Sequence, residues 1–271
     1  MFILKSDTLD VAVLDPDADQ DRFGARYCTG GYIFQITDAR CGPLLTGPTY
    51  PESFNWRDGQ GIPDSFAQRP LCPPELVGTT ALVIGIGLCN MATREVLQYC
   101  SWQVEPAASA VAMKTTQQWE GFVLSLERTV SVSGRTVRSA SRVHNIGARP
   151  LPILWFPHPF FPQPSGPELC RVSIPVTMPE NPGYTLGSGG YIERRAWPSQ
   201  DGFYQALDHA ATSPVTVLQR HSALGLVAGT TSYTPSLFPI WGNQKTFSWE
   251  PFFERTLAPG QEARWWIDYD F

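Results

Sequence analysis

The sequence predicts an all-β protein, a β-supersandwich of large antiparallel sheets with few or no long helices. The 25 prolines and 23 glycines are spread along the 271 residues, which favours many short strands joined by turns. Several segments alternate apolar and polar residues, and helical periodicity is scarce. With 42% hydrophobic and 17% charged residues, the chain can fill a sizeable core, and we expect a single domain over residues 1–271.

The individual strands follow from alternation and turn residues, in chain order. Residues 30–38, GGYIFQITD, are aromatic and β-branched after a glycine pair and predict a strand. Residues 123–145 form two alternating runs around Ser133-Gly134, the pattern of a hairpin. Residues 215–233 predict another pair of strands, with a turn near Ser222. The final ARWWIDYDF alternates bulky residues and predicts a closing strand.

Two short segments need separate treatment. Residues 92–100, ATREVLQYC, fit a short helix or a strand, and periodicity does not decide between them. The GIG at 85–87 is similar to a nucleotide-binding glycine loop, but Asn90 stands where the third glycine belongs and no P-loop lysine follows. We therefore expect a β-turn or close strand packing there.

The composition of the chain argues against several classes of binding partner. The net charge of −5, without a basic run, argues against nucleic acid and anionic membranes. No apolar run approaches 18 residues, and the N-terminal MFILKSDTLDVAVLD lacks the parts of a signal peptide. The six cysteines include no CxxC pair and no metal-binding spacing. They predict free thiols in a reducing compartment rather than disulfides, and hence a cytoplasmic protein without a metal.

Two residues are the first candidates for chemistry. His158 lies between two prolines in LPILWFPHPFFPQP (151–164), and Glu250 lies between Trp249 and Pro251. If 247–261 is one unbroken strand, Glu250, Phe252 and Glu254 share a face. A carboxylate among aromatic residues is costly to bury unpaired, so it reaches a wet cleft or meets a partner. From the residues alone, a structural salt bridge for Glu250 and a hydrogen-bonded loop histidine for His158 remain open. No GxSxG, HExxH or EF-hand pattern occurs.

The passage VHNIGARPLPILWFPHPFF (143–161) resembles a signature of the galactose mutarotase-like superfamily, the aldose 1-epimerases. That signature is Asn-x-(Gly/Ser)-x-x-x-(Leu/Met)-Pro followed by His-Pro-(Phe/Tyr)-Phe. The matching residues here are Asn145, Gly147, Pro150, Pro152, His158, Pro159, Phe160 and Phe161. The C-terminal FSWEPFFERTLAPGQEARWWIDYDF resembles the family's late strands, with Glu250, Leu257, Pro259, Gly260 and Tyr269 in the matching places. The Gly-Ile-Pro in the looser match over 24–66 is similar to the hexose-6-phosphate epimerase branch.

The resemblance implies a β-supersandwich and a cofactor-free reaction, the interconversion of α and β sugar anomers. By resemblance, Glu250 is the base that takes the proton of the anomeric hydroxyl. His158 is the acid that protonates the ring oxygen. The expected ligand is a monosaccharide or a sugar phosphate, and the oligomeric state stays open.

Further ligand-binding residues are also expected by resemblance. Asp208 in QALDHAA is the best match for the family's sugar-binding aspartate, with Asp201 as a competitor. Trp155 and Trp241 are candidates for stacking on the sugar, with core packing as the alternative for each. The chain departs from the family in one respect, because no histidine precedes His144. The phosphate-sugar branch has a histidine soon after Gly-Ile-Pro, where this chain has Asp64-Ser65-Phe66 and then Arg69.

Two other functions remain as hypotheses. One is a non-catalytic carbohydrate-binding or sensing protein on the same fold. The other is a glycosidase, which needs a second carboxyl group about 5–10 Å from Glu250, and Glu254 is the nearest candidate. The joint presence of His158 and Glu250 favours catalysis, because binding alone needs neither an acid nor a base at those places.

Overall fold

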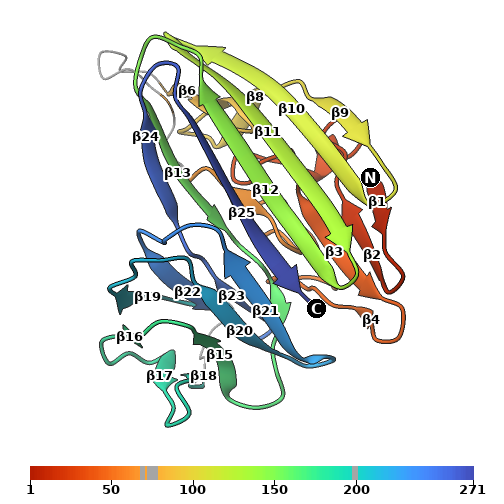
Figure 1. Cartoon of the computed structure of the whole chain (residues 1–271), viewed down its shortest axis with the longest axis vertical. Helices are drawn as coiled ribbons and strands as arrows, with labels where there is room; N and C mark the ends of the chain where they lie inside the picture. The colour runs from red at the N-terminus through yellow and green to blue at the C-terminus, as the bar shows by residue number, and fades with distance from the viewer. Residues whose placement is uncertain (68–70, 72–78, 197–200) are drawn as a thin grey trace.

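The computed structural model describes residues 1–67, 71, 79–196 and 201–271. The described chain folds into five antiparallel sheets, and its one helix is the 3₁₀ turn η1 (Gln20–Arg22). Figure 1 shows the longest strands side by side in one half of the molecule, with β15–β23 gathered at the other end. The prediction of an all-β sandwich is confirmed.

The largest sheet has ten strands, and every pair in it is antiparallel. Its long strands β11 and β12 alternate buried and less buried residues along their length, so one face of the sheet covers the core. In spatial order the strands are β17 (Tyr184–Leu186), β18 (Ile192–Arg194), β15 (Glu168–Val172), β20 (Thr216–His221), β21 (Gly225–Thr231), β25 (Glu262–Asp270), β12 (Thr136–Asn145), β11 (Phe122–Ser133), β10 (Ala110–Trp119) and β9 (Gln103–Pro106).

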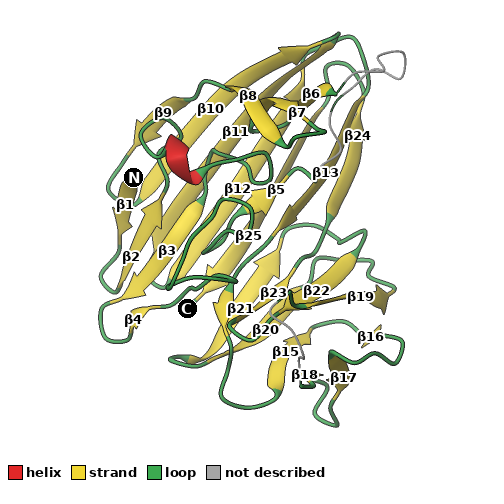
Figure 2. Cartoon of the chain, turned by 180° about the vertical axis from the view of Figure 1, so that it is seen from behind, coloured by secondary structure: helices red, strands yellow, loops and turns green. Residues whose placement is uncertain are grey.

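Four smaller sheets complete the sandwich, and Figure 2 shows them from behind. A five-stranded sheet has the order β14 (Phe161–Pro162), β23 (Thr246–Trp249), β22 (Phe238–Gly242), β19 (Phe203–His209) and β16 (Val176–Thr177). A four-stranded sheet contains β1 (Phe2–Lys5), β2 (Leu9–Val13), β3 (Ile33–Asp38) and β4 (Gly42–Pro43). The two three-stranded sheets are β24 (Phe253–Leu257), β13 (Leu151–Pro157) and β5 (Asp64–Ser65), and β6 (Thr80–Val83), β7 (Gly87–Asn90) and β8 (Glu95–Tyr99).

The predicted strands are present. The hairpin of 123–145 is β11 and β12, with Ser133 opposite Thr136 across a turn whose Gly134 has φ +56°. The pair of 215–233 is β20 and β21, the closing strand is β25, and 30–38 contains β3. Residues 92–100 are a turn followed by β8, which settles the ambiguous segment as a strand.

The glycine pair at 85–87 forms the turn between β6 and β7. Gly85 has φ +75° and Gly87 has φ +136°, values that side-chain-bearing residues rarely adopt. A Cβ on Gly87 would also lie 2.0 Å from the Gln98 carbonyl oxygen. The expectation of a β-turn or close strand packing is confirmed.

Residues 247–261 are not one unbroken strand, so the condition for a shared face is not met. The chain leaves the sheet between β23 and β24, at residues 250–252. Pro251 has no N–H to donate to a strand partner, and its carbonyl oxygen accepts a hydrogen bond of 2.6 Å from the Tyr233 hydroxyl. As a result Glu250 and Glu254 do not share a strand face, and Glu254 is exposed on β24.

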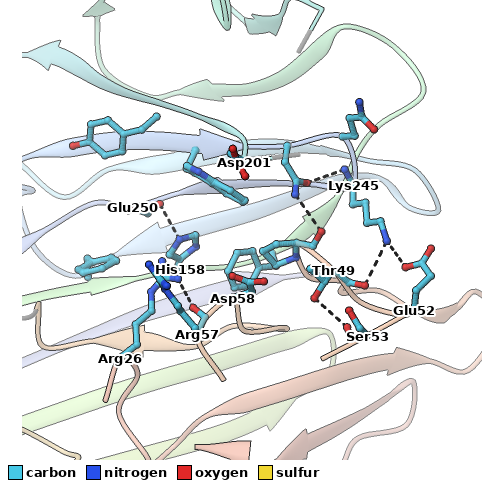
Figure 3. A pocket seen from close by; sticks show the side chains of 17 residues that line it. Arg26, Thr49, Glu52, Ser53, Arg57, Asp58, His158, Asp201, Lys245 and Glu250 are labelled. Carbon is cyan, nitrogen blue, oxygen red and sulfur yellow. Dashed lines mark hydrogen bonds and ion pairs between the residues drawn. The ribbon is translucent and has the colours of Figure 1, made fainter. Parts of the chain in front are cut away.

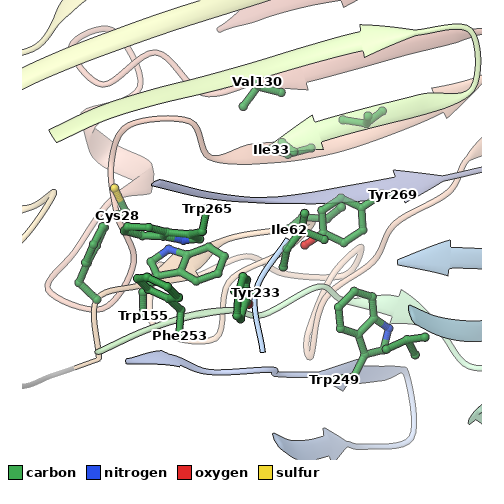
Figure 4. Packing of buried hydrophobic residues seen from close by; sticks show 14 of the residues in the cluster. Cys28, Ile33, Ile62, Val130, Trp155, Tyr233, Trp249, Phe253, Trp265 and Tyr269 are labelled. Carbon is green, nitrogen blue, oxygen red and sulfur yellow. The ribbon is translucent and has the colours of Figure 1, made fainter. Parts of the chain in front are cut away.

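One contiguous cluster of buried apolar side chains runs from Leu4 to Phe271. Its aromatic centre joins β13, β24 and β25, as Figure 4 shows. The rings of Phe253 and Trp265 stack with centroids 4.4 Å apart, and Trp155 meets Trp265 edge-on at 5.6 Å. Fixed ring packing of this kind contributes about 0.5–1.5 kcal/mol per pair beyond the buried area. It also holds the β13–β24 pair against the large sheet.

A buried ion pair lies beneath the same sheet. The Arg128 guanidinium on β11 bonds the Asp64 carboxylate on β5, and both side chains are about 95% buried or more. Arg128 also donates to the Ser139 hydroxyl at 3.1 Å and to the Gly30 carbonyl oxygen at 3.2 Å. These bonds connect the ten-stranded sheet to β5, the strand paired with the end of β13.

The described residues contain no helix long and apolar enough to cross a membrane. Five cysteines, Cys28, Cys41, Cys89, Cys100 and Cys170, are free thiols. Cys72 lies outside the described residues.

Candidate active site

A cleft of about 790 Å³ opens where β13, the loop of residues 46–59 and the five-stranded sheet meet. His158 and Glu250 lie in its wall, and Figure 3 shows the two side chains facing one another. The remaining lining residues are Arg26, Pro48, Thr49, Glu52, Ser53, Arg57, Asp58, Phe156, Phe160, Asp201, Tyr204, Trp241, Asn243, Gln244 and Lys245.

His158 follows directly after β13, and the backbone fixes it there. Its N–H donates to the Pro63 carbonyl oxygen at 2.8 Å, and the N–H of Phe160 donates to that of Gly61 at 2.7 Å. Rings surround the imidazole, with the centroid of Phe160 at 4.4 Å and that of Trp241 at 5.8 Å. The crowded apolar sequence around His158 therefore forms a cage that orients the ring and leaves it only 4% exposed.

Glu250 follows directly after β23, where the strand breaks. Its N–H donates to the Pro239 carbonyl oxygen at 2.9 Å, which keeps it beside β22. The carboxylate Oε1 lies 3.3 Å from His158 Nε2. Because the strand ends here, the side chain points into the cleft rather than into the sheet sandwich. Chain segments almost a hundred residues apart thus place one acid–base pair in one cleft.

Burial shifts the pKa values of Glu250 and His158 in opposite directions. It raises the pKa of the Glu250 carboxyl to about 8, against the opposing effect of the Arg26 charge. It lowers the pKa of the His158 imidazole well below its ordinary value of 6.5, and Arg26 lowers it further. Desolvation penalises the charged form of each group. At neutral pH these shifts favour the neutral forms of both groups, so the one titratable proton of the pair lies on the Glu250 carboxyl group.

Lys245 and Asn243 bond the loop of residues 46–59 at one side of the cleft. Lys245, in the turn between β22 and β23, forms an ion pair with Glu52 and donates to the Thr49 carbonyl oxygen at 3.4 Å. Asn243 donates to the Pro48 carbonyl oxygen at 3.1 Å. These bonds fasten the loop of residues 46–59 to the five-stranded sheet.

Only some of the predicted ligand-binding residues line the cleft. Trp241 and Asp201, the competitor of Asp208, line the cleft. Asp208 does not line it, because it lies exposed on β19 opposite Thr177 of β16. Trp155 does not line it either, because side chains alternate along β13: Phe156 faces the cleft while Trp155 is buried in the core. Arg69 lies outside the described residues.

Several cleft residues were not predicted from the sequence. Arg26, Asp58 and Tyr204 come from three loops or strands that no motif connects. The only sequence signal was the loose family match over 24–66, which contains Arg26 and Asp58 without marking either. Tyr204 is 53% exposed and lies directly opposite Trp241 in the strand register, so the two rings extend the apolar wall of the cleft.

The signature residues before His158 serve the fold. The Asn145 amide donates to the carbonyl oxygens of Arg149 and Leu257, both at 2.8 Å. Its Oδ1 accepts the Gly147 N–H at 3.1 Å. A Cβ on Gly147 would lie 2.6 Å from the Val123 nitrogen. This turn fixes the start of β13 against β24, and so aligns the strand that carries His158.

Within the part of the chain that the structure describes, no group of three or more His, Cys, Asp or Glu side chains is arranged to hold a metal ion.

Comparisons with known proteins support the fold. No protein-family model and no curated protein sequence matches the chain. Among solved structures, a galactose mutarotase related enzyme from Lactobacillus acidophilus is similar, with a TM-score of 0.64 at 11% identity, covering 99% of this chain and 96% of that one. A galactose mutarotase-like protein from Lactobacillus casei gives 0.61 at 14% identity, covering 100% and 99%. A putative aldose 1-epimerase from Escherichia coli K12 gives 0.60 at 15% identity, covering 99% and 97%.

These similarities extend over nearly the whole chain, so the protein has the galactose mutarotase-like fold. The resemblance stated from the motifs around His158 and Glu250 is confirmed at the level of the fold.

Proposed function

We propose that this protein interconverts the α and β anomers of a sugar by acid–base catalysis with Glu250 and His158. The observation that carries the proposal is the 3.3 Å contact between the carboxylate and the imidazole, both buried, in the wall of a cleft. The fold shared with aldose 1-epimerase-like proteins supports the reaction class.

The reaction needs one base and one acid on either side of the anomeric centre. The Glu250 carboxylate takes the proton of the anomeric hydroxyl while the His158 imidazolium gives its proton to the ring oxygen. The bond between C1 and the ring oxygen breaks, and the open chain carries an aldehyde at C1. Rotation about C1–C2 and the reverse transfers close the ring as the other anomer and restore both groups. Acid–base assistance of this kind contributes about 10²–10⁴-fold to a rate.

The shifted pKa values of Glu250 and His158 suit their roles as base and acid. A carboxylate whose pKa is raised to about 8 is a stronger base than an exposed glutamate. An imidazolium whose pKa is lowered is a stronger acid than an exposed histidine. In the free protein the same shifts keep the titratable proton of the pair on the Glu250 carboxyl group. A bound sugar that donates its hydroxyl to Glu250 favours the carboxylate, and so moves the proton to His158.

The first prediction concerns the two single variants. His158→Asn and Glu250→Gln each keep a polar side chain and remove the titrating group, so we expect each to lower anomer exchange at least about 100-fold. Exchange spectroscopy by NMR on free and phosphorylated hexoses measures the rate, and circular dichroism checks the fold. Glu254→Gln, on the exposed side of β24, is the matched control. Full activity in either active-site variant contradicts the acid–base assignment.

A non-catalytic carbohydrate-binding or sensing protein is the alternative function. In that case the wild-type protein binds sugars but leaves anomer exchange at the rate of the buffer. The glycosidase hypothesis loses its nominated second carboxylate, because Glu254 is exposed on β24 rather than in the cleft.

A further inference from the structure

Tyr27 lies behind the wall of the cleft and contacts two residues that line it. Its side chain is 2% exposed and does not line the cleft, so it acts on a bound sugar only through its neighbours. The ring meets the His158 imidazole in a T-shaped contact, with centroids 6.2 Å apart. The Arg26 guanidinium lies over the same ring, with its carbon 4.8 Å from the centroid. We propose that Tyr27 is a positioning residue, which holds the His158 ring, the Arg26 guanidinium and the loop of residues 46–59 in place around the acid–base pair.

Ring packing, rather than a hydrogen bond at the second nitrogen, orients the His158 imidazole. A histidine whose tautomer matters is commonly held by a hydrogen bond at that nitrogen. Among the described residues, however, none bonds His158 Nδ1, which is buried. The imidazole is surrounded by the rings of Tyr27, Phe156, Phe160 and Trp241. The last three of these line the cleft, so Tyr27 is the one that supports the imidazole from inside the protein. A turn of the imidazole would move Nε2 away from the Glu250 carboxylate.

The hydroxyl of Tyr27 makes a bond that a phenylalanine could not make. It donates to the Asp58 carbonyl oxygen at 3.2 Å. Burial raises the pKa of Tyr27 above its ordinary value of 10, so the hydroxyl keeps its proton and stays a donor. The loop also packs on the ring, since a Cβ on Gly59 would lie 2.7 Å from Tyr27 Cε2. Because this loop carries Thr49, Ser53 and Asp58 to the cleft, Tyr27 fixes part of the surface that meets a sugar.

The face of the Tyr27 ring supports the Arg26 charge, because a guanidinium is attracted to the negative face of an aromatic ring. Arg26 also donates to the Arg57 carbonyl oxygen. Figure 3 shows its side chain beside His158, and its charge lowers the pKa values of both His158 and Glu250. The other ionisable groups that line the cleft are Glu52, Arg57, Asp58, Asp201, Tyr204 and Lys245. Among these described groups none shifts either pKa, so the place of the Arg26 guanidinium affects the protonation of the pair most directly.

The second prediction separates the ring of Tyr27 from its hydroxyl, and its kinetic part rests on the proposed function. Tyr27→Phe keeps the ring and loses the bond to the loop, so we expect KM to rise about fivefold and kcat to stay within about twofold. Tyr27→Leu loses both, so we expect kcat to fall at least about tenfold, because the imidazole is no longer aligned with Glu250. Exchange spectroscopy by NMR on free and phosphorylated hexoses measures both constants, and circular dichroism checks the fold.

Tyr99 provides the matched controls. Its hydroxyl also donates to a backbone carbonyl oxygen, that of Phe23, at 3.1 Å, and its side chain does not line the cleft. Tyr99→Phe and Tyr99→Leu should therefore leave kcat and KM unchanged. Wild-type kcat in Tyr27→Leu, or an equal loss of kcat in Tyr99→Leu, overturns the proposal. If Tyr27→Leu does not fold, Tyr27→Phe decides, because an unchanged KM in that variant overturns the proposal as well.

The pKa of Glu250 separates the failure of this proposal from the failure of the proposed function. If Tyr27→Leu releases Arg26, the opposing positive charge is lost and the pKa of the Glu250 carboxyl rises above about 8. If the smaller side chain only admits water, desolvation is relieved and the same pKa falls. Carbon-13 NMR titration of the glutamate carboxyl groups, with Glu250→Gln to assign the signal, measures this pKa without turnover. A rise supports the positioning role even where the wild-type protein exchanges no anomers, and a fall or no change overturns it.

Discussion

Burying His158 and Glu250 costs free energy, because each side chain loses the hydration of its charged form. Their neighbours are mostly rings, and Arg26 is the one charge that affects the pKa of both among the described groups. A chain that needed only stability would place apolar residues at these positions. Retaining two titratable groups in contact within a cleft is the pattern expected of a functional site rather than of a core.

The third prediction concerns the stability of the folded protein. The pKa of Glu250 is raised from 4.5 to about 8 in the folded state. Its contribution to stability is therefore complete below about pH 4.5 and is lost as the pH rises toward 8. Glu250→Gln cannot ionise, so its free energy of unfolding should exceed that of the wild-type protein by roughly 5 kcal/mol at pH 9, with little difference at pH 4.5.

Urea unfolding of Glu250→Gln and of the exposed control Glu254→Gln at the two pH values measures this difference. An equal stability gain at both pH values, or a gain in the control as well, contradicts a buried and titrating Glu250.

The sequence indicated these two residues only through a resemblance. The residues alone left His158 open as a hydrogen-bonded loop histidine and Glu250 as part of a structural salt bridge. The family signature joined them, and the structure places them 3.3 Å apart. The same reasoning failed for Trp155, because the stacking hypothesis took no account of which face of β13 that ring occupies. Phe156, its neighbour, is the residue that lines the cleft.

At the scale of elements, the short strand β5 determines where β13 ends. Pro157 of β13 pairs with Asp64, and the Asp64 carboxylate bonds Arg128 of β11 beneath the large sheet. Burial raises the pKa of Asp64, and the Arg128 charge opposes the rise. This ion pair thus anchors the strand that carries His158 to the ten-stranded sheet.

The fourth prediction follows from this anchor. Asp64→Asn leaves the Arg128 guanidinium buried without its counter-charge, so we expect a loss of about 3–5 kcal/mol in the free energy of unfolding. The matched exposed pair is Arg138–Asp268, where Asp268→Asn should change stability by about 1 kcal/mol or less. Urea denaturation of both variants measures the contrast, and similar values for the two would contradict a buried anchor at Asp64.

Strands whose turns are marked by residues in the same segment were the most predictable from the sequence. Alternating residues around Ser133-Gly134 gave the β11–β12 hairpin, since turn and strand signals lie within one segment. The break between β23 and β24 was missed, although Pro251 was a visible cue for it. The chain at this break also bonds a residue outside the segment. The Tyr233 hydroxyl, 18 residues earlier in the chain, donates to the Pro251 carbonyl oxygen. Local patterns carry no information about such a partner.

At the scale of the whole molecule, the sandwich itself was predictable because composition, turn residues and alternation all favour strands. The cleft was not, because it forms where separate sheets and loops meet. Arg26, Asp58 and Tyr204 carry no motif in the sequence, and only the packing of separate segments brings them to one cleft.

We propose that His158 and Glu250 act together on a sugar anomer. The most direct test is NMR exchange between α and β hexose anomers, with the wild-type protein, both single variants and the double variant His158→Asn/Glu250→Gln. We predict exchange proportional to wild-type protein concentration. The double variant should be no slower than either single variant, because residues acting as a unit are non-additive. Wild-type exchange at the buffer rate, for free and phosphorylated hexoses alike, would contradict a catalytic role for His158 and Glu250.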